Sequence, residues 1–93
     1  MLYTYIDARH DYTGVTEDMY LYWDKLKCGG IFAGHDFLDA NEVPGQDWSV
    51  DHKGVRRTDG KAVKSAVIEF ASKKKRSLFI TTSVFSASWY FRK

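Results

Sequence analysis

The sequence contains a single cysteine, Cys28, so no disulfide can form within the chain. A chain of this kind is more easily placed in a reducing compartment, and we expect a cytoplasmic protein. No apolar run approaches the length of a membrane span, and the amino terminus lacks the basic-then-apolar pattern of a signal peptide. The formal net charge of +2 is too near zero to indicate a polyanionic partner. We therefore expect neither a membrane nor a nucleic-acid partner.

Several sequence signatures of common active sites are also missing. There is no Gly-x-Gly-x-x-Gly motif, no phosphate-binding loop and no serine in a nucleophile-elbow context. The one charge run, Lys73-Lys74-Lys75-Arg76, is typical of the carboxyl end of a helix, which attracts cations, and is too short to indicate nucleic-acid binding. Cys28 has no acid–base partner nearby in sequence, and we interpret it as structural.

The composition is that of one small globular domain, because 44% of the 93 residues are hydrophobic and 16% are aromatic. Periodicity and breaker residues predict a Rossmann-like α/β fold, a partial sheet in β-α-β-(flap)-α-β-β order. Only a short link joins the last two strands, so we expect them to pair antiparallel. The first strand looks buried on both faces, as in the middle of a sheet. The predicted strands are 2–6, 31–34, 78–82 and 86–92, and the predicted helices are 13–27 (or 15–27) and 59–74.

Each predicted helix carries one apolar stripe at a helical period. We expect Thr13 or Thr16 to cap the first helix, and Thr58 or Asp59 to cap the second. The stripe of the first helix is Val15, Met19, Tyr22, Trp23 and Leu26, and that of the second is Ala62, Val63, Ala66, Val67 and Phe70.

Residues 37–57 form a long connection, and loops of this length are usually functional or carry a small structure of their own. The segments 48–50 and 55–57 flank a turn that contains Gly54, which predicts a small hairpin with glycine at the positive-φ position. We interpret residues 37–57 as a flap inserted near the functional site.

Polar side chains follow the first two predicted strands, where Asp7 and His10 come after one and His35 and Asp36 after the other. In a strand–helix–strand unit both strands point the same way, so these residues should gather at one carboxyl edge, where open α/β sheets bind their ligands. Carboxylate and imidazole groups can hold a divalent metal, and a histidine can serve as a general base. The alternative is that these are ordinary solvated residues at strand ends.

The motif Asp-x-x-His-x-Tyr that begins at Asp7 is followed by Gly-Gly-x-x-x-x-His-Asp, which begins at Gly29. This pairing resembles the carboxyl-terminal half of class I S-adenosylmethionine-dependent methyltransferases, and in particular the metal-dependent small-molecule O-methyltransferase-like group. The resemblance covers nearly the whole chain. It implies that the strands predicted here are the fourth to seventh of a seven-stranded sheet, which ends in a reversed strand.

The resemblance also implies a set of site residues. The divalent metal, which the resemblance suggests is Mg²⁺, would be held by Asp7, His35 and Asp36, with His35 standing where relatives often have a carboxylate. His10 would be the general base, with Asp7 as the second catalytic residue. S-adenosylmethionine would contact Asp7, Ala8 and Tyr12. The acceptor would be the hydroxyl of a small molecule.

One departure from that family is an absence, because its glycine-rich cofactor loop and the ribose-binding acid after its second strand do not occur in this sequence. We therefore expect residues 1–93 to be a single methyltransferase-like domain that is truncated at its amino terminus. Two alternatives remain open. One is an inactive remnant that acts as a binding or assembly module and forms homo-oligomers through its exposed first strand. The other is a small metal-binding protein or metallohydrolase without a cofactor.

Overall fold

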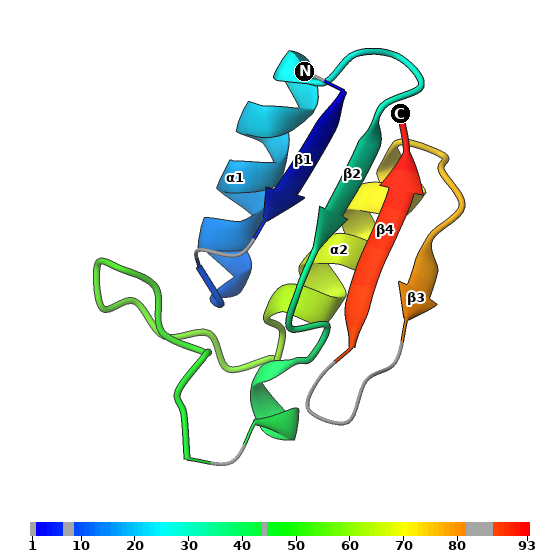
Figure 1. Cartoon of the computed structure of the whole chain (residues 1–93). Coiled ribbons are helices and arrows are strands. Elements are labelled where there is room, and N and C mark those ends of the chain that lie inside the picture. Colours follow the sequence, from blue (N-terminus) through cyan, green and yellow to red (C-terminus); the bar gives the residue numbers. More distant parts are fainter. Residues whose placement is uncertain (1, 7–8, 44, 82–86) are drawn as a thin grey trace.

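Four strands and two α-helices follow one another in the predicted order in a computed structural model of the chain (Figure 1). The structure describes residues 2–6, 9–43, 45–81 and 87–93. The α/β class and the order of its elements are confirmed. The elements are β1 (Tyr3–Ile6), α1 (Tyr12–Lys25), β2 (Ile31–Gly34), a short 3-10 helix (Ala40–Glu42), α2 (Val63–Lys73), β3 (Phe79–Thr81) and β4 (Ser88–Arg92).

The strands form one mixed sheet in the order β1-β2-β4-β3. β1 and β2 are parallel, with Ile6 opposite Gly34 at their carboxyl ends. β4 lies between β2 and β3 and runs antiparallel to both, so the antiparallel pairing predicted for the last two strands is confirmed. β4 is therefore the one reversed strand among those the structure describes.

Both helices cover the same side of the sheet (Figure 1). Phe32 on β2 and Phe91 on β4 are fully buried there, and the Trp23 ring of α1 lies 5.3 Å from the Phe32 ring and 5.4 Å from the Phe70 ring of α2. Buried aromatic rings supply much of the apolar area in a core of this size. The predicted stripes are confirmed, since all their members are buried except Tyr22, which is partly buried.

The amino end of α1 lies earlier than predicted. The backbone N–H of Gly14 donates to the Asp11 carboxylate at 2.8 Å, which makes Asp11 the N-cap residue. The prediction of Thr13 or Thr16 as the cap was wrong. Asp is as good a cap as Ser or Thr, and here it comes first, so the helix already begins at Tyr12.

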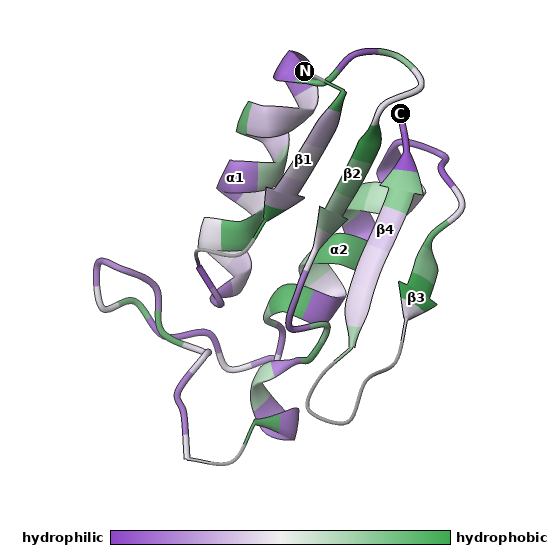
Figure 2. Ribbon diagram, viewed as in Figure 1, coloured by the Kyte–Doolittle hydropathy of each residue, from purple (hydrophilic) through white to green (hydrophobic). Residues whose placement is uncertain are grey.

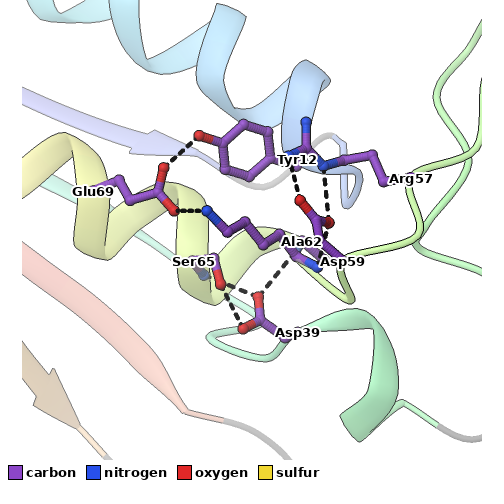
Figure 3. A network of polar contacts seen from close by, with 8 residues as sticks. Tyr12, Asp39, Arg57, Asp59, Ala62, Ser65 and Glu69 are labelled. Atoms are coloured by element: carbon purple, nitrogen blue, oxygen red, sulfur yellow. Dashed lines mark hydrogen bonds and ion pairs between the residues drawn. The ribbon is translucent and has the colours of Figure 1, made fainter.

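The cap of α2 comes from a distant part of the chain (Figure 3). Asp39 accepts hydrogen bonds from the backbone N–H groups of Ala62 and Ser65, both at 2.9 Å, and from the Ser65 hydroxyl at 2.7 Å. Asp59 instead pairs with Arg57 at 2.6 Å. The prediction of Thr58 or Asp59 as the cap was wrong, because the connection after β2 folds back onto the helix start and supplies the carboxylate.

The predicted hairpin within residues 37–57 is present in a minimal form. Val50 and Arg56 form one antiparallel bridge, and the N–H of Asp51 donates to the carbonyl of Val55 at 3.0 Å. Gly54 has a φ of +81°, as the turn requires. Neither helix in the described part of the chain is long and apolar enough to cross a membrane.

Candidate functional site

The parallel pairing of β1 and β2 brings two polar segments to one edge of the sheet. Residues 9–11 lead from β1 into α1, and His35 and Asp36 follow β2 directly. His10 Nε2 lies 3.0 Å from Asp36 Oδ2, so the two predicted clusters meet at this edge. The His10 side chain is 40% exposed and that of Asp36 is 24% exposed, which leaves both groups accessible to a ligand.

Asp36 lies between two histidines. Its second carboxylate oxygen, Oδ1, is 3.8 Å from His35 Nε2, and His35 Nδ1 is 3.2 Å from the Ser88 hydroxyl of β4. The backbone of Asp36 has a φ of +58°, in the left-handed region that Asp tolerates better than most residues. This turn after β2 coincides with the approach of one carboxylate to two imidazoles.

Trp48 reaches the same edge from the hairpin segment. Its indole stacks on the His10 imidazole, with ring centroids 4.6 Å apart and planes inclined by 14°. Trp48 is buried, and its Nε1 donates to the Gln46 side-chain oxygen at 2.9 Å. Trp48 belongs to the predicted flap, and its indole covers one face of the His10 ring. Beside this stack is an open depression of about 410 Å³, lined by His10, Asp11, Gln46, Asp47, Trp48 and Val50.

The rim of this depression carries an ionised carboxylate. Hydrogen bonds from Arg56 and from the Ser49 side chain lower the pKa of Asp47 from 3.8 to about 2. In the adjoining turn, the backbone N–H groups of Val55 and Lys53 lower the pKa of Asp51. These carboxylates remain negatively charged over the whole physiological pH range.

Arg9 connects the edge of the sheet to the hairpin. Its guanidinium lies 2.7 Å from His52 Nδ1 and pairs with Glu17 at 3.2 Å. Arg9 and the Trp48–His10 stack thus hold the hairpin segment against the start of α1 at two separate points.

Tyr12, which the resemblance assigns to cofactor binding, lies apart from the His10–Asp36 contact. Its hydroxyl donates to Glu69 of α2 at 2.6 Å, and the Arg57 guanidinium lies 4.1 Å from the centre of its ring (Figure 3). The hydrogen bond to Glu69, followed by burial, raises the pKa of Tyr12. Asp7 and Ala8 lie outside the described residues, so their predicted roles, like that of Tyr12, stay predictions.

Within the described ranges, no three His, Cys, Asp or Glu side chains gather closely enough to hold a metal ion. The predicted ligand set, Asp7, His35 and Asp36, includes one residue outside those ranges, so the metal remains a prediction. The two described members fit it chemically, because an imidazole nitrogen and a carboxylate oxygen stand 3.8 Å apart at the open edge.

Sequence reasoning did not find two residues of this site. Trp48 gave a weak signal, as a large aromatic residue within a polar connection. Ser88 gave none, because its contact with His35 depends on the insertion of β4 beside β2. No protein family, curated protein or solved structure matches the sequence.

Proposed function

We propose that this chain is an S-adenosylmethionine-dependent methyltransferase-like domain of the cytoplasm. It supplies the metal-binding and proton-accepting side of a site for O-methyl transfer to the hydroxyl of a small molecule. The observation that carries the proposal is the approach of His10 Nε2 to Asp36 Oδ2 at the carboxyl edge of β1 and β2. Residues from the two family-like motifs thereby become neighbours at the edge where such sheets bind ligands.

The geometry suits a general base. A carboxylate beside an imidazole nitrogen fixes the tautomer and orientation of the ring, as in other histidine-based sites. The Trp48 stack restricts the ring further, and the exposed part of His10 borders the open depression. A substrate hydroxyl placed in that depression is within reach of an oriented imidazole, which can accept its proton.

The topology supports the same family. The resemblance implies a sheet that ends in a reversed strand, and β4 is the reversed strand at the end of this chain. Its antiparallel pairing with β3, which the short link between the two strands predicted, suits the same arrangement.

The metal would be held by Asp7, Asp36 and His35, and Asp7, Ala8 and Tyr12 would contact the cofactor. When bound, a divalent ion orients and acidifies the acceptor hydroxyl, and S-adenosylmethionine supplies the methyl group from its sulfonium. Asp36 would then both orient the His10 ring and hold the metal together with His35, because one of its oxygens faces His10 and the other faces His35. The chain aligns the acceptor, and His10 takes the proton.

Calorimetric titration with Mg²⁺, Mn²⁺ and Zn²⁺ tests the metal part of the proposal. We expect at least one ion to bind, and Asp36→Asn to weaken binding by about tenfold or more. Asp24→Asn is the matched control, since Asp24 is an exposed aspartate on α1 away from the edge, and it should leave binding unchanged. If folded protein binds none of the three ions, or the control loses as much affinity as Asp36→Asn, the proposal fails.

The cofactor part has a separate test. The family's glycine-rich loop is absent from this sequence, so we expect the chain by itself to bind S-adenosylmethionine weakly or not at all. Equilibrium dialysis with labelled cofactor measures this directly. Tight binding would show that the cofactor is held in another way and would contradict the assignment of this chain to the metal-and-base side.

A second candidate function, an assembly module, is favoured by the free edge of β1. The carbonyl of Leu2 accepts a hydrogen bond from Ile31 of β2, and that of Ile6 accepts one from His35 directly after β2, so the backbone groups of Tyr3 and Tyr5 point outward. No strand in the described residues pairs with that side. Such an edge can pair with a second copy. Light scattering should then show dimers that Tyr3→Pro disrupts and Tyr3→Ser preserves, since only proline removes the outward N–H. A monomer at high concentration would exclude this candidate.

A further inference from the structure

The two faces of the sheet differ sharply. The helices bury one face, which carries Thr4, Phe32 and Phe91. On the other face, Tyr5, Ala33, Tyr90 and Phe79 stand opposite one another in a single row across all four strands. In β1 this alternation leaves Tyr3 and Tyr5 exposed while Thr4 and Ile6 are buried, so the expectation that both faces of the first strand are buried was wrong.

The open face is rich in exposed aromatic rings. The exposed fractions are 55% for Tyr3, 52% for Phe79, 45% for Tyr5 and 39% for Tyr90. The Phe79 and Tyr90 rings stack on one another, with centroids 5.3 Å apart. Because an aromatic side chain carries about 200 Å² of surface, four half-exposed rings present about 400 Å². Patches of that size on a monomer often mark an interaction site.

The described strand positions of this face are uncharged except for one, which favours a largely apolar partner. These positions carry no carboxylate and one cation, Arg92, which stands opposite Ile31 at the end of β4 and donates to the Gly29 carbonyl at 3.2 Å. Lys74 of the basic run lies over the Tyr20 and Phe70 rings in the helix layer. A single-stranded nucleic acid needs cations along its backbone as well as rings for stacking, and among the described strand positions of this face Arg92 is a single cation rather than a row of them.

We propose that the open face, defined by Tyr3, Tyr5, Tyr90 and Phe79, binds the same face of a second copy of this chain. Two sheets pack face to face about 10 Å apart through interdigitating side chains, and rings in one row can fill the spaces beside Ala33 of the partner. A standard interface buries about 800 Å² per partner, so about 400 Å² of rings with their flanking residues corresponds to a weak, reversible dimer. This contact differs from pairing along the β1 edge, which would leave the face open.

Sedimentation velocity of the full chain over a wide concentration range tests the proposal. We expect a reversible monomer–dimer equilibrium, and Tyr90→Thr should raise the dissociation constant by about tenfold or more. Threonine retains the strand preference while it removes the ring. Tyr5→Thr, on the edge strand, provides a second reading if Tyr90→Thr does not fold, as judged by circular dichroism. Leu21→Gln is the control, because Leu21 is 52% exposed on α1 outside the face and should not affect the equilibrium.

Three results would overturn the proposal. The first is a monomer at all concentrations. The second is a dimer that Tyr3→Pro dissociates but Tyr90→Thr and Tyr5→Thr do not, which would assign the contact to the β1 edge. The third is binding of a single-stranded oligonucleotide that both threonine variants abolish while no dimer forms. Concentration-dependent shifts of the Tyr5, Tyr90 and Phe79 ring resonances in NMR spectra would support it independently.

Discussion

His10 Nε2 and Asp36 Oδ2 lie 3.0 Å apart, although 26 positions separate the two residues in the sequence. Both side chains are partly exposed, and pairs of this kind contribute about 1 kcal/mol or less to stability. We therefore predict that His10→Gln changes the free energy of unfolding, measured by urea titration, by less than about 1 kcal/mol. A loss of several kcal/mol would mean that the contact holds the fold together, and its role as a site would lose support.

The capping of α2 by Asp39 is a structural contact with a larger expected effect. Asp39→Ala removes the acceptor of two backbone N–H groups and one hydroxyl, and should lower the free energy of unfolding by about 1–2 kcal/mol. Asp39→Asn retains one side-chain oxygen and should cost less. Asp59→Ala is the comparison, since Asp59 binds Arg57 on the surface. An Asp59→Ala effect as large as that of Asp39→Ala would instead support Asp59 as the cap of α2, as the sequence predicted.

Gly34 lies directly against the Trp89 indole. A Cβ at this position would clash with the ring, so Gly34→Ala forces Trp89 to move within a fully buried site. We predict a loss of about 1–3 kcal/mol in the free energy of unfolding, as for other overpacked cores. The double variant Gly34→Ala/Trp89→Phe should recover part of the Gly34→Ala loss relative to Trp89→Phe alone, because the smaller ring leaves room. Strictly additive effects would contradict the steric explanation.

Two exposed aspartates should make the free energy of unfolding depend on pH in the acid range. Arg57 lowers the pKa of Asp59, and Arg56 lowers that of Asp47, in both cases from 3.8 to about 2. A carboxylate whose pKa is lower in the folded state stabilises the fold above its unfolded pKa, and this contribution disappears as the pH falls through the folded value. The free energy of unfolding should therefore decrease between about pH 4 and pH 2. Asp47→Asn/Asp59→Asn should decrease less steeply over this window, and an unchanged slope would refute the assignment.

Local sequence patterns predicted the helices and their buried stripes because a helical period depends only on nearby residues. The burial of residues such as Val15, Met19 and Phe70 could therefore be predicted from the sequence. The Asp39 cap and the position of β4 beside β2 depend on contacts between distant segments, and no local pattern encodes them. The same limit explains why the exposed face of β1 was not anticipated. Tyr3 and Tyr5 are aromatic and suggested burial, but no second helix layer in the described part of the chain covers them.

The candidate site was predictable to the extent that it follows from parallel strands. His10, His35 and Asp36 come after strand ends, and the parallel pairing alone brings them to one edge. The Trp48 stack and the Ser88 contact with His35 were not predictable, because they depend on how the hairpin folds back and where β4 inserts.

The position of a bound metal tests the central claim most directly. Mn²⁺ broadens the NMR resonances of nuclei around it, so a titration with substoichiometric Mn²⁺ locates its site in the folded chain. We predict that the resonances of His10, His35 and Asp36 broaden first, while those of Asp47 and Asp51, in the hairpin segment, broaden less. Broadening centred on the hairpin carboxylates, or none at any site, would contradict the assignment of this edge as the metal-and-base side of a methyltransferase-like domain.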